Sequence, residues 1–377
     1  METGKDLTPV FLLTGFLGSG KTTLLNALLK APEFANTAVV VNEFGEIGLD
    51  HFLIERSQDN VVLLEAGCLC CTISDSLHET LAELNARRVR GEIPAFTRVV
   101  IETTGLADPA PIVSTLLGNR LVTDHYRLDA VIVTVDAQHV VEGIKAHPEV
   151  AKQIAVADRL VLTKADLAPP DTGLFEQLKQ LNPVAPIITS TEGAGALQAF
   201  AALPRHRVEV FGADVQGQRH KHAHHGHEHG PHEHGHDHAH QHEQHEHGAQ
   251  SSHNVNRHDA HIRAHCLVIG HPASWAGIAA WWRLVSTLLG DRLLRCKGIV
   301  RIEDTGEIVF LQGVQRVLHR PERLAGWPDA DHRSRLVCIS RDVDEAQLRA
   351  TLFALDLPVG SDPETALIQF QDRKNTP

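Results

Sequence analysis

The chain has 377 residues, 42% of them hydrophobic, which is enough for two domains with buried cores. Its formal net charge of -12 argues against a nucleic-acid partner, because contacts to phosphates need a basic surface. The apolar runs 10–13 and 275–282 are too short for a signal peptide core or a membrane span. We therefore expect a cytoplasmic protein with no membrane partner.

The cysteine pattern also favours a reducing compartment. The chain has 6 cysteines, and three of them lie within residues 68–71. Such crowding does not suit a disulfide framework and leaves thiols available for a metal.

Residues 6–210 alternate short runs rich in valine and isoleucine with segments of helical periodicity. This pattern predicts an α/β domain with a mostly parallel sheet and helices on both faces. The expected strands are 10–13, 38–41, 61–64, 99–101, 130–135, 160–162 and 187–188.

A phosphate-binding loop follows the first expected strand. Residues 15–22 read G-F-L-G-S-G-K-T, which fits the pattern G-x-x-x-x-G-K-[ST], and a helical segment follows. Backbone amides and the helix N-terminus would wrap the phosphates. Lys21 would reach the β- and γ-phosphates, and the Thr22 hydroxyl would bind Mg²⁺. The strand–loop–helix setting argues against a chance match.

Three cysteines, Cys68, Cys70 and Cys71, stand just before a helix expected at 72–86. They cannot all face one way from a regular helix or strand, but an irregular turn can gather them around Zn²⁺. A fourth position stays open for Glu46, Glu43, water or a partner protein. Buried or redox-active cysteines are the alternative interpretation.

An acidic residue ends the strand at 99–101. Glu102 begins the run E-T-T-G, and we expect it to hold Mg²⁺ together with Thr22, while the amide of Gly105 senses the γ-phosphate. A glutamate that caps the next helix is the alternative.

Residues 163–166 read T-K-A-D, a variant of the guanine motif N-K-x-D. The carboxylate of Asp166 can accept both N–H groups of guanine, whereas adenine offers neither there. We therefore expect Thr163, Lys164 and Asp166 to select guanine, although Thr163 replaces the usual asparagine. An ordinary loop with a solvated lysine is the alternative.

Histidine dominates the middle of the chain. Of 27 histidines, 18 lie between His220 and His265, in a segment with few aliphatic residues. We expect residues 211–260 to be a disordered linker. Its closely spaced imidazoles would form weak zinc sites, for example through His222, His224, His227 and His229. A solvated spacer that binds no zinc is the alternative.

A second domain is expected at 261–372. Strands at 265–269, 293–302, 307–312 and 335–340 and helices at 275–289 and 344–355 predict a small α+β domain of the ferredoxin-like type. Cys266, Cys296 and Cys338 stand singly in apolar strands, where packing is their expected role.

These motifs together resemble the CobW family of metal-handling GTPases. The matching segments are G-F-L-G-S-G-K-T-T, N-E-F-G-E-I-G-L-D, E-A-G-C-L-C-C, E-T-T-G-L-A-D-P, T-K-A-D, the histidine-rich linker and R-C-K-G at 295–298. The resemblance implies GTP hydrolysis coupled to metal delivery to a client protein, with a loop at 42–50 that rearranges with the γ-phosphate. It implies a metal on the three clustered cysteines and nucleotide contacts from Gly15, Gly18, Ser19, Gly20, Lys21, Thr22 and Thr23.

Two functions stay open at this point. One is a GTPase that delivers zinc to a client, and the other is a zinc storage or buffering protein. The intact nucleotide motifs favour the first, because storage needs none of them. Cobalt remains an alternative to zinc, in a protein linked to cobalamin biosynthesis, and the choice between monomer and homodimer is open.

Overall fold

The computed structural model of this protein describes residues 7–41, 62–65, 73–167, 173–191, 195–201, 262–358 and 364–375. The loop predicted at 42–50, the cysteine motif at 67–71 and the linker predicted at 211–260 lie outside the described residues.

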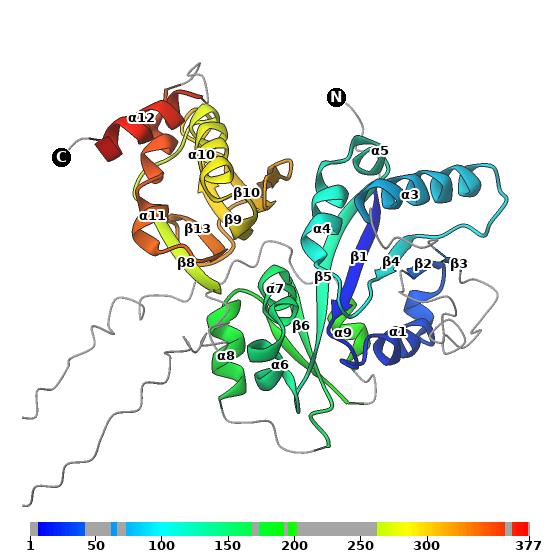
Figure 1. Ribbon diagram of the computed structural model, residues 1–377. Coiled ribbons are helices and arrows are strands. Elements are labelled where there is room, and N and C mark those ends of the chain that lie inside the picture. Colours follow the sequence, from blue (N-terminus) through cyan, green and yellow to red (C-terminus); the bar gives the residue numbers. More distant parts are fainter. Residues whose placement is uncertain are drawn as a thin grey trace, which may run out of the picture. The chain divides into compact units, whose positions relative to one another are not determined.

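Seven parallel strands of the described residues form one sheet, in the order β3-β2-β4-β1-β5-β6-β7 (Figure 1). All seven strands predicted from the apolar runs are confirmed. Their bounds are β1 (Thr8–Gly15), β2 (Thr37–Val41), β3 (Val62–Glu65), β4 (Arg98–Glu102), β5 (Tyr126–Asp136), β6 (Arg159–Thr163) and β7 (Ile187–Ser190).

Helices cover both faces of this sheet, as a parallel sheet requires. Alternate residues of β1 show how the faces are divided. Phe11 and Leu13 share a core with α1 and α9, whereas Val10 and Leu12 share a core with α3, α4, α7 and α8. The helices are α1 (Lys21–Leu29), η1 (Pro32–Phe34), α3 (Ile73–Val89), α4 (Pro109–Gly118), α5 (Arg120–Thr123), α6 (Val140–Ala146), α7 (Pro148–Val156), α8 (Leu174–Leu181) and α9 (Ala196–Phe200).

The second sheet is antiparallel and follows the path β11-β10-β9-β13-β8, with β12 paired to β10. Strand β13 lies between the parallel strands β8 and β9, and α10 connects these two, which makes a split βαβ unit. The predicted α+β class is confirmed. A ferredoxin-like domain inserts its third strand at this point, whereas here the inserted strand β13 is the last of the six described strands, because β10 pairs with the outer side of β9 and β11 and β12 pair with β10.

The elements of this part are β8 (Ile262–Ile269), α10 (Trp275–Leu289), η3 (Gly290–Arg292), β9 (Leu293–Arg301), β10 (Ile308–Val314), β11 (Val317–Leu318), β12 (Glu322–Leu324), β13 (Ser334–Arg341), α11 (Glu345–Arg349), η4 (Leu352–Asp356) and α12 (Glu364–Asn375).

The helix predicted at 344–355 is shorter than expected. Asp344 and Gln347 form a capping box at its start, as the acidic beginning indicated, but α11 ends at Arg349 and a 3₁₀ turn follows. The Thr351 hydroxyl donates to the carbonyl of Leu348 at 2.6 Å and accepts from the Trp281 indole N–H at 3.0 Å. These bonds replace the helical continuation.

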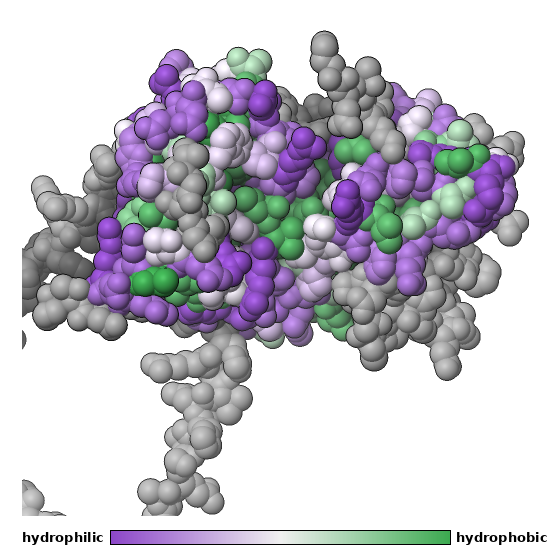
Figure 2. All heavy atoms as spheres, turned by 90° about the horizontal axis from the view of Figure 1, so that it is seen from above, coloured by the Kyte–Doolittle hydropathy of each residue, from purple (hydrophilic) through white to green (hydrophobic). Residues whose placement is uncertain are grey.

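Hydrophobic residues appear as patches among hydrophilic ones on the face seen in Figure 2. No helix of the described residues is long and apolar enough to cross a membrane.

A buried ion pair ties the second sheet to the first. The carboxylate of Asp158, immediately before β6, is 14% exposed and lies 2.6 Å from Arg295 Nη2, and it also pairs with Lys297. Its other oxygen accepts from the backbone N–H of Val131 at 2.8 Å. Burial would raise the pKa of Asp158, but the two cations and these hydrogen bonds lower it to about 2.

This pKa predicts how acid affects folding. A carboxyl whose pKa falls from 3.8 to about 2 on folding stabilises the folded state above pH 3.8. The stabilisation is about 2 kcal/mol, and it is lost as the pH falls through about 2.

We therefore expect Asp158→Asn to lower the free energy of unfolding at pH 7 by about 2–5 kcal/mol and to weaken its pH dependence between pH 4 and 2. Urea unfolding at several pH values measures both. If the free energy of unfolding changed equally with pH in the two proteins between pH 4 and 2, the lowered pKa of Asp158 would be contradicted.

Candidate functional site

The loop between β1 and α1 has the backbone of a phosphate-binding loop. Gly15 has φ +143°, and a Cβ there would lie 2.3 Å from Thr134 Oγ1, so no other residue fits without a shift. Gly20 has φ +87° and gives α1 no side-chain cap, which leaves the N–H groups of the first turn available to an anion.

Lys21 lies across this loop. Its ammonium donates to the carbonyls of Gly15 and Phe16, at 2.9 and 3.2 Å. Such a placement holds a positive charge at the point where the predicted phosphates would enter.

The two residues predicted to bind Mg²⁺, Thr22 and Glu102, are in direct contact. The Thr22 hydroxyl donates to Glu102 Oε1 at 3.0 Å, although the two residues are 80 positions apart. Glu102 is 5% exposed at the end of β4, directly beside Leu13 of β1. Both atoms are hard oxygen donors of the kind that Mg²⁺ prefers, so these residues fit that ion.

The contacts of the Thr163 hydroxyl give a structural reason for threonine at the position where the guanine motif usually has asparagine. Its hydroxyl lies 2.8 Å from the carbonyl of Ser19 and 3.1 Å from that of Val135, and it donates to one of them at a time. Thr163 therefore joins the end of β6, where the predicted guanine motif begins, to the phosphate-binding loop between β1 and α1. A second contact of this loop joins two hydroxyls, Ser19 and Thr134, at 2.6 Å and holds the loop to β5.

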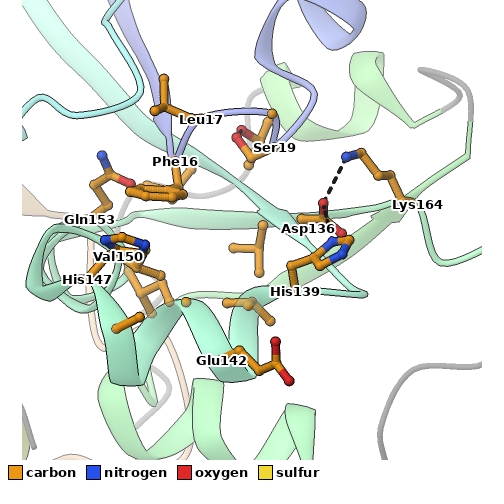
Figure 3. A pocket seen from close by; sticks show the side chains of 18 residues that line it. Phe16, Leu17, Ser19, Asp136, His139, Glu142, His147, Val150, Gln153 and Lys164 are labelled. Carbon is orange, nitrogen blue, oxygen red and sulfur yellow. Dashed lines mark hydrogen bonds and ion pairs between the residues drawn. The ribbon is translucent and has the colours of Figure 1, made fainter.

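Lys164 is held in position by an acid that the sequence analysis did not identify. Its ammonium donates to Asp136 Oδ2 at 2.8 Å, as Figure 3 shows, and Asp136 also contacts His139 at 3.1 Å. Burial would raise the pKa of Asp136, but hydrogen bonds from Lys164, the Gln138 N–H and His139 keep this pKa below its usual value. An acidic residue at the end of a buried strand was the available signal.

Asp166 follows in an exposed turn, where its carboxylate is accessible to a base. Ser190, at the end of the next strand, is buried. Thr163, Lys164 and Asp166 thus lie at the same edge of the sheet as Gly15 and Glu102.

A cavity of about 470 Å³ lies on the other flank of the loop, between it, β5 and the helices α6 and α7. The ring of Phe16 stacks on His147 with centroids 4.6 Å apart at its rim (Figure 3). Aliphatic side chains of β5, α6 and α7 line part of the cavity, and polar side chains, among them His139, Glu142 and Gln153, line much of the rest.

The predicted zinc ligands, Cys68, Cys70, Cys71, Glu46, His222, His224, His227 and His229, lie outside the described residues. Strand β3 ends at Glu65, at the same edge of the sheet as Glu102 of β4, and α3 begins at Ile73. Among the described residues, no group of three or more His, Cys, Asp or Glu side chains forms a metal cluster.

The other three cysteines have the packing role predicted for them, Cys266 as a partly buried residue against a core cluster. Cys296 and Cys338 are buried with their sulfurs 3.6 Å apart, and this contact and burial raise the pKa of Cys338 well above its usual value. It therefore stays a thiol rather than a metal-binding thiolate. Cys266 is only half-buried.

This chain is similar to known proteins over nearly its whole length. Residues 9–189 match the family described as CobW/HypB/UreG, nucleotide-binding domain, and residues 262–355 match the Cobalamin synthesis protein cobW C-terminal domain. The zinc chaperone YjiA of Escherichia coli is 31% identical over 92% of this chain and 98% of its own length. The crystal structure of Zn(II)-bound YjiA GTPase from E. coli superposes with a TM-score of 0.62 at 26% identity, over 93% of this chain and 99% of that one.

Other relatives match over about half of their length. The zinc chaperone CobW of Pseudomonas aeruginosa is 37% identical over 42% of this chain and 49% of its own. The zinc-regulated GTPase metalloprotein activator 1 of Schizosaccharomyces pombe is 32% identical over 50% and 47%.

The tie made by Thr163 generates a prediction. We expect Thr163→Val to weaken binding of guanine nucleotides by about tenfold, because the buried carbonyl of Ser19 loses its donor and the loop its anchor. Thr163→Ser keeps the hydroxyl and should bind nearly as the parent does. Fluorescent GDP titration measures both, and equal affinities of Thr163→Val and the parent would contradict this role.

Proposed function

Because this chain belongs to the CobW/HypB/UreG family, we propose that it hydrolyses GTP and couples hydrolysis to the delivery of zinc to a client protein. Relatives named as zinc chaperones and as a zinc-regulated GTPase support the proposal. The division into a GTPase domain at 6–210, a histidine-rich linker at 211–260 and a second domain at 261–372 is part of it.

One observation carries the GTPase part: the contact between Thr22 and Glu102 beside Lys21. In our proposal Lys21 neutralises the β- and γ-phosphates, and backbone amides of Gly18, Ser19, Gly20 and Thr23 surround them. Thr22 and Glu102 would hold Mg²⁺, which supplies further positive charge against the phosphates. Lys21, Thr22 and the backbone amides would orient the nucleotide in a phosphate loop that is already formed.

Guanine selection rests on Asp166, which accepts from two N–H groups of the base. Asp136 holds the ammonium of Lys164 through the 2.8 Å ion pair, which would leave the aliphatic stem of Lys164 beside that base. Thr163, through its bond to the Ser19 carbonyl, fixes the distance between the guanine motif and the phosphate loop. These three contacts come from the ends of adjacent strands, which argues for one continuous nucleotide site.

For the cargo we propose Cys68, Cys70 and Cys71, with Glu46 as the fourth ligand. Three thiolates suit a soft divalent ion, and an exchangeable fourth position suits an ion that must be passed on. Weak zinc sites on His222, His224, His227 and His229 would collect the ion. Zinc is preferred to cobalt because of the names of the relatives, and delivery is preferred to storage because the hydrolytic residues are present.

A prediction tests the choice of base. Asp166→Asn should weaken GTP binding by at least about tenfold, since the carboxylate that accepts two hydrogen bonds is gone. Xanthosine triphosphate should gain affinity, because the new amide can donate to the additional carbonyl of xanthine. Competition against fluorescent GDP measures these affinities. ATP competing as well as GTP in the parent protein would contradict guanine selection.

A second prediction tests the coupling. Zinc should bind about tenfold more tightly with a non-hydrolysable GTP analogue than with GDP, because β2 and β3 both end at the edge of the sheet that carries the phosphate loop. A chromogenic chelator competing for zinc measures the affinity in each state. The triple Cys→Ser variant at 68, 70 and 71 is the control and should lack the tight site in both. Equal zinc affinities in the two states would refute coupling.

A further inference from the structure

Gln153 is a buried polar residue with no place in the nucleotide motifs. It lies on α7, is 1% exposed, and has aliphatic neighbours on the same helix that belong to the core. Its side-chain amide donates to the carbonyl of Gly105 at 3.2 Å and to that of Ala107 at 3.0 Å. Both hydrogens of the amide are therefore used on one short segment of backbone.

That segment lies directly on the phosphate loop. A Cβ at Gly105 would come within 2.5 Å of the backbone nitrogen of Leu17, so the two backbones are in contact. The segment begins three residues after Glu102, at the end of β4. Any movement of Gly105 therefore changes the surroundings of Leu17 in the phosphate loop.

A second residue of α7 holds the far end of the same segment. Lys152 donates to Asp108 Oδ2 at 3.1 Å, while the other oxygen of Asp108 caps α4 through the N–H of Ala110. The segment 105–108 is thus fixed to α7 at three points.

Packing does not replace these anchors. The cavity of about 470 Å³ separates much of α7 from the phosphate loop, and Gln153 reaches from α7 at its edge, close to Phe16 and Leu17 (Figure 3). Glycine has the freest backbone of all residues, so an anchor on its carbonyl strongly restricts its conformations. Without the amide, the carbonyls of Gly105 and Ala107 would lose their donors, and the bond from the Ala107 N–H to the Thr104 carbonyl and the Lys152–Asp108 pair would remain.

We infer that Gln153 is a positioning residue for GTP hydrolysis, which holds the peptide groups of residues 105–108 in the conformation that meets the γ-phosphate. The inference rests on the proposed function. It requires that Gln153 act mainly on the GTP state, because GDP has no phosphate at that position. Preorganised backbone dipoles lower the barrier only when they are already in place.

Gln153→Met tests this inference, since methionine has nearly the same length but no N–H group. We expect kcat for GTP to fall by about tenfold or more, with KM within threefold and the affinity for GDP within twofold. The preference for a GTP analogue over GDP should shrink. Single-turnover hydrolysis and fluorescent nucleotide titration measure these quantities.

Asn182→Leu is the matched control. Asn182 is also 1% exposed, and its amide donates to the carbonyls of Ile154, Ala155 and Ala157 at the C-terminal end of α7, none of which belongs to the segment 105–108. This variant should lower the melting temperature but keep kcat within threefold. An equal loss of kcat in both variants would reduce Gln153 to a structural residue, and an unchanged kcat in Gln153→Met would overturn the inference.

Lys152→Met gives an independent variant, because Lys152 is half-buried and its loss does not leave a cavity in the core. It should lower kcat in the same direction by a smaller factor, and an unchanged kcat would count against the anchoring of residues 105–108. A parent protein that binds no guanine nucleotide would refute the proposed function. Normal GTP hydrolysis in the parent, together with an unaffected Gln153→Met, would refute only this inference.

Discussion

The whole site depends on one constraint, the parallel direction of the seven strands. Parallel strands bring their carboxyl ends to one edge of the sheet, where the loops that follow them must meet. The register is explicit: Leu13 pairs with Glu102, Gly15 with Thr134, and Asp136 with Thr163. A phosphate loop, a carboxylate for a cation and a base-selecting motif therefore share one edge, although they come from distant parts of the chain.

Buried hydroxyl groups hold the phosphate loop and the neighbouring strand ends in this frame, in addition to the Lys21 ammonium that donates to the carbonyls of Gly15 and Phe16. Ser19 is bonded to Thr134, Thr163 contacts the carbonyl of Ser19, and Thr103 donates to Thr14 at 2.7 Å. These groups are buried, so their hydrogen bonds do not compete with water and a lost partner is costly. Neutral anchors of this kind fix the backbone of the loop without adding a further charge beside Lys21.

The segment 105–108 is held differently from the phosphate loop. The side chains that anchor it, Gln153 and Lys152, come from a single helix, α7, and a cavity lies beside Gln153. A segment fixed by a few polar contacts can change conformation more easily than one enclosed by packing. The same helix leads into Asp158, whose ion pairs reach Arg295 and Lys297 of β9. The nucleotide edge and the second sheet are thus connected through a short stretch of chain.

The sequence by itself determined the elements and the chemistry of single motifs. Apolar runs predicted every strand of the first sheet, and the spacing of G-F-L-G-S-G-K-T predicted the loop, Lys21 and Thr22. Glu102 was found because an acid that ends a buried strand has few structural reasons to be there. The contacts that orient these groups were not predictable: Lys164 with Asp136, Gln153 with Gly105, and Arg295 with Asp158 are 28, 48 and 137 residues apart. They depend on the order of the strands and on which helix covers which face, and local periodicity carries no information about either. Only the tertiary structure decided them, because a buried polar group takes its partner from whatever element the fold places within hydrogen-bonding distance.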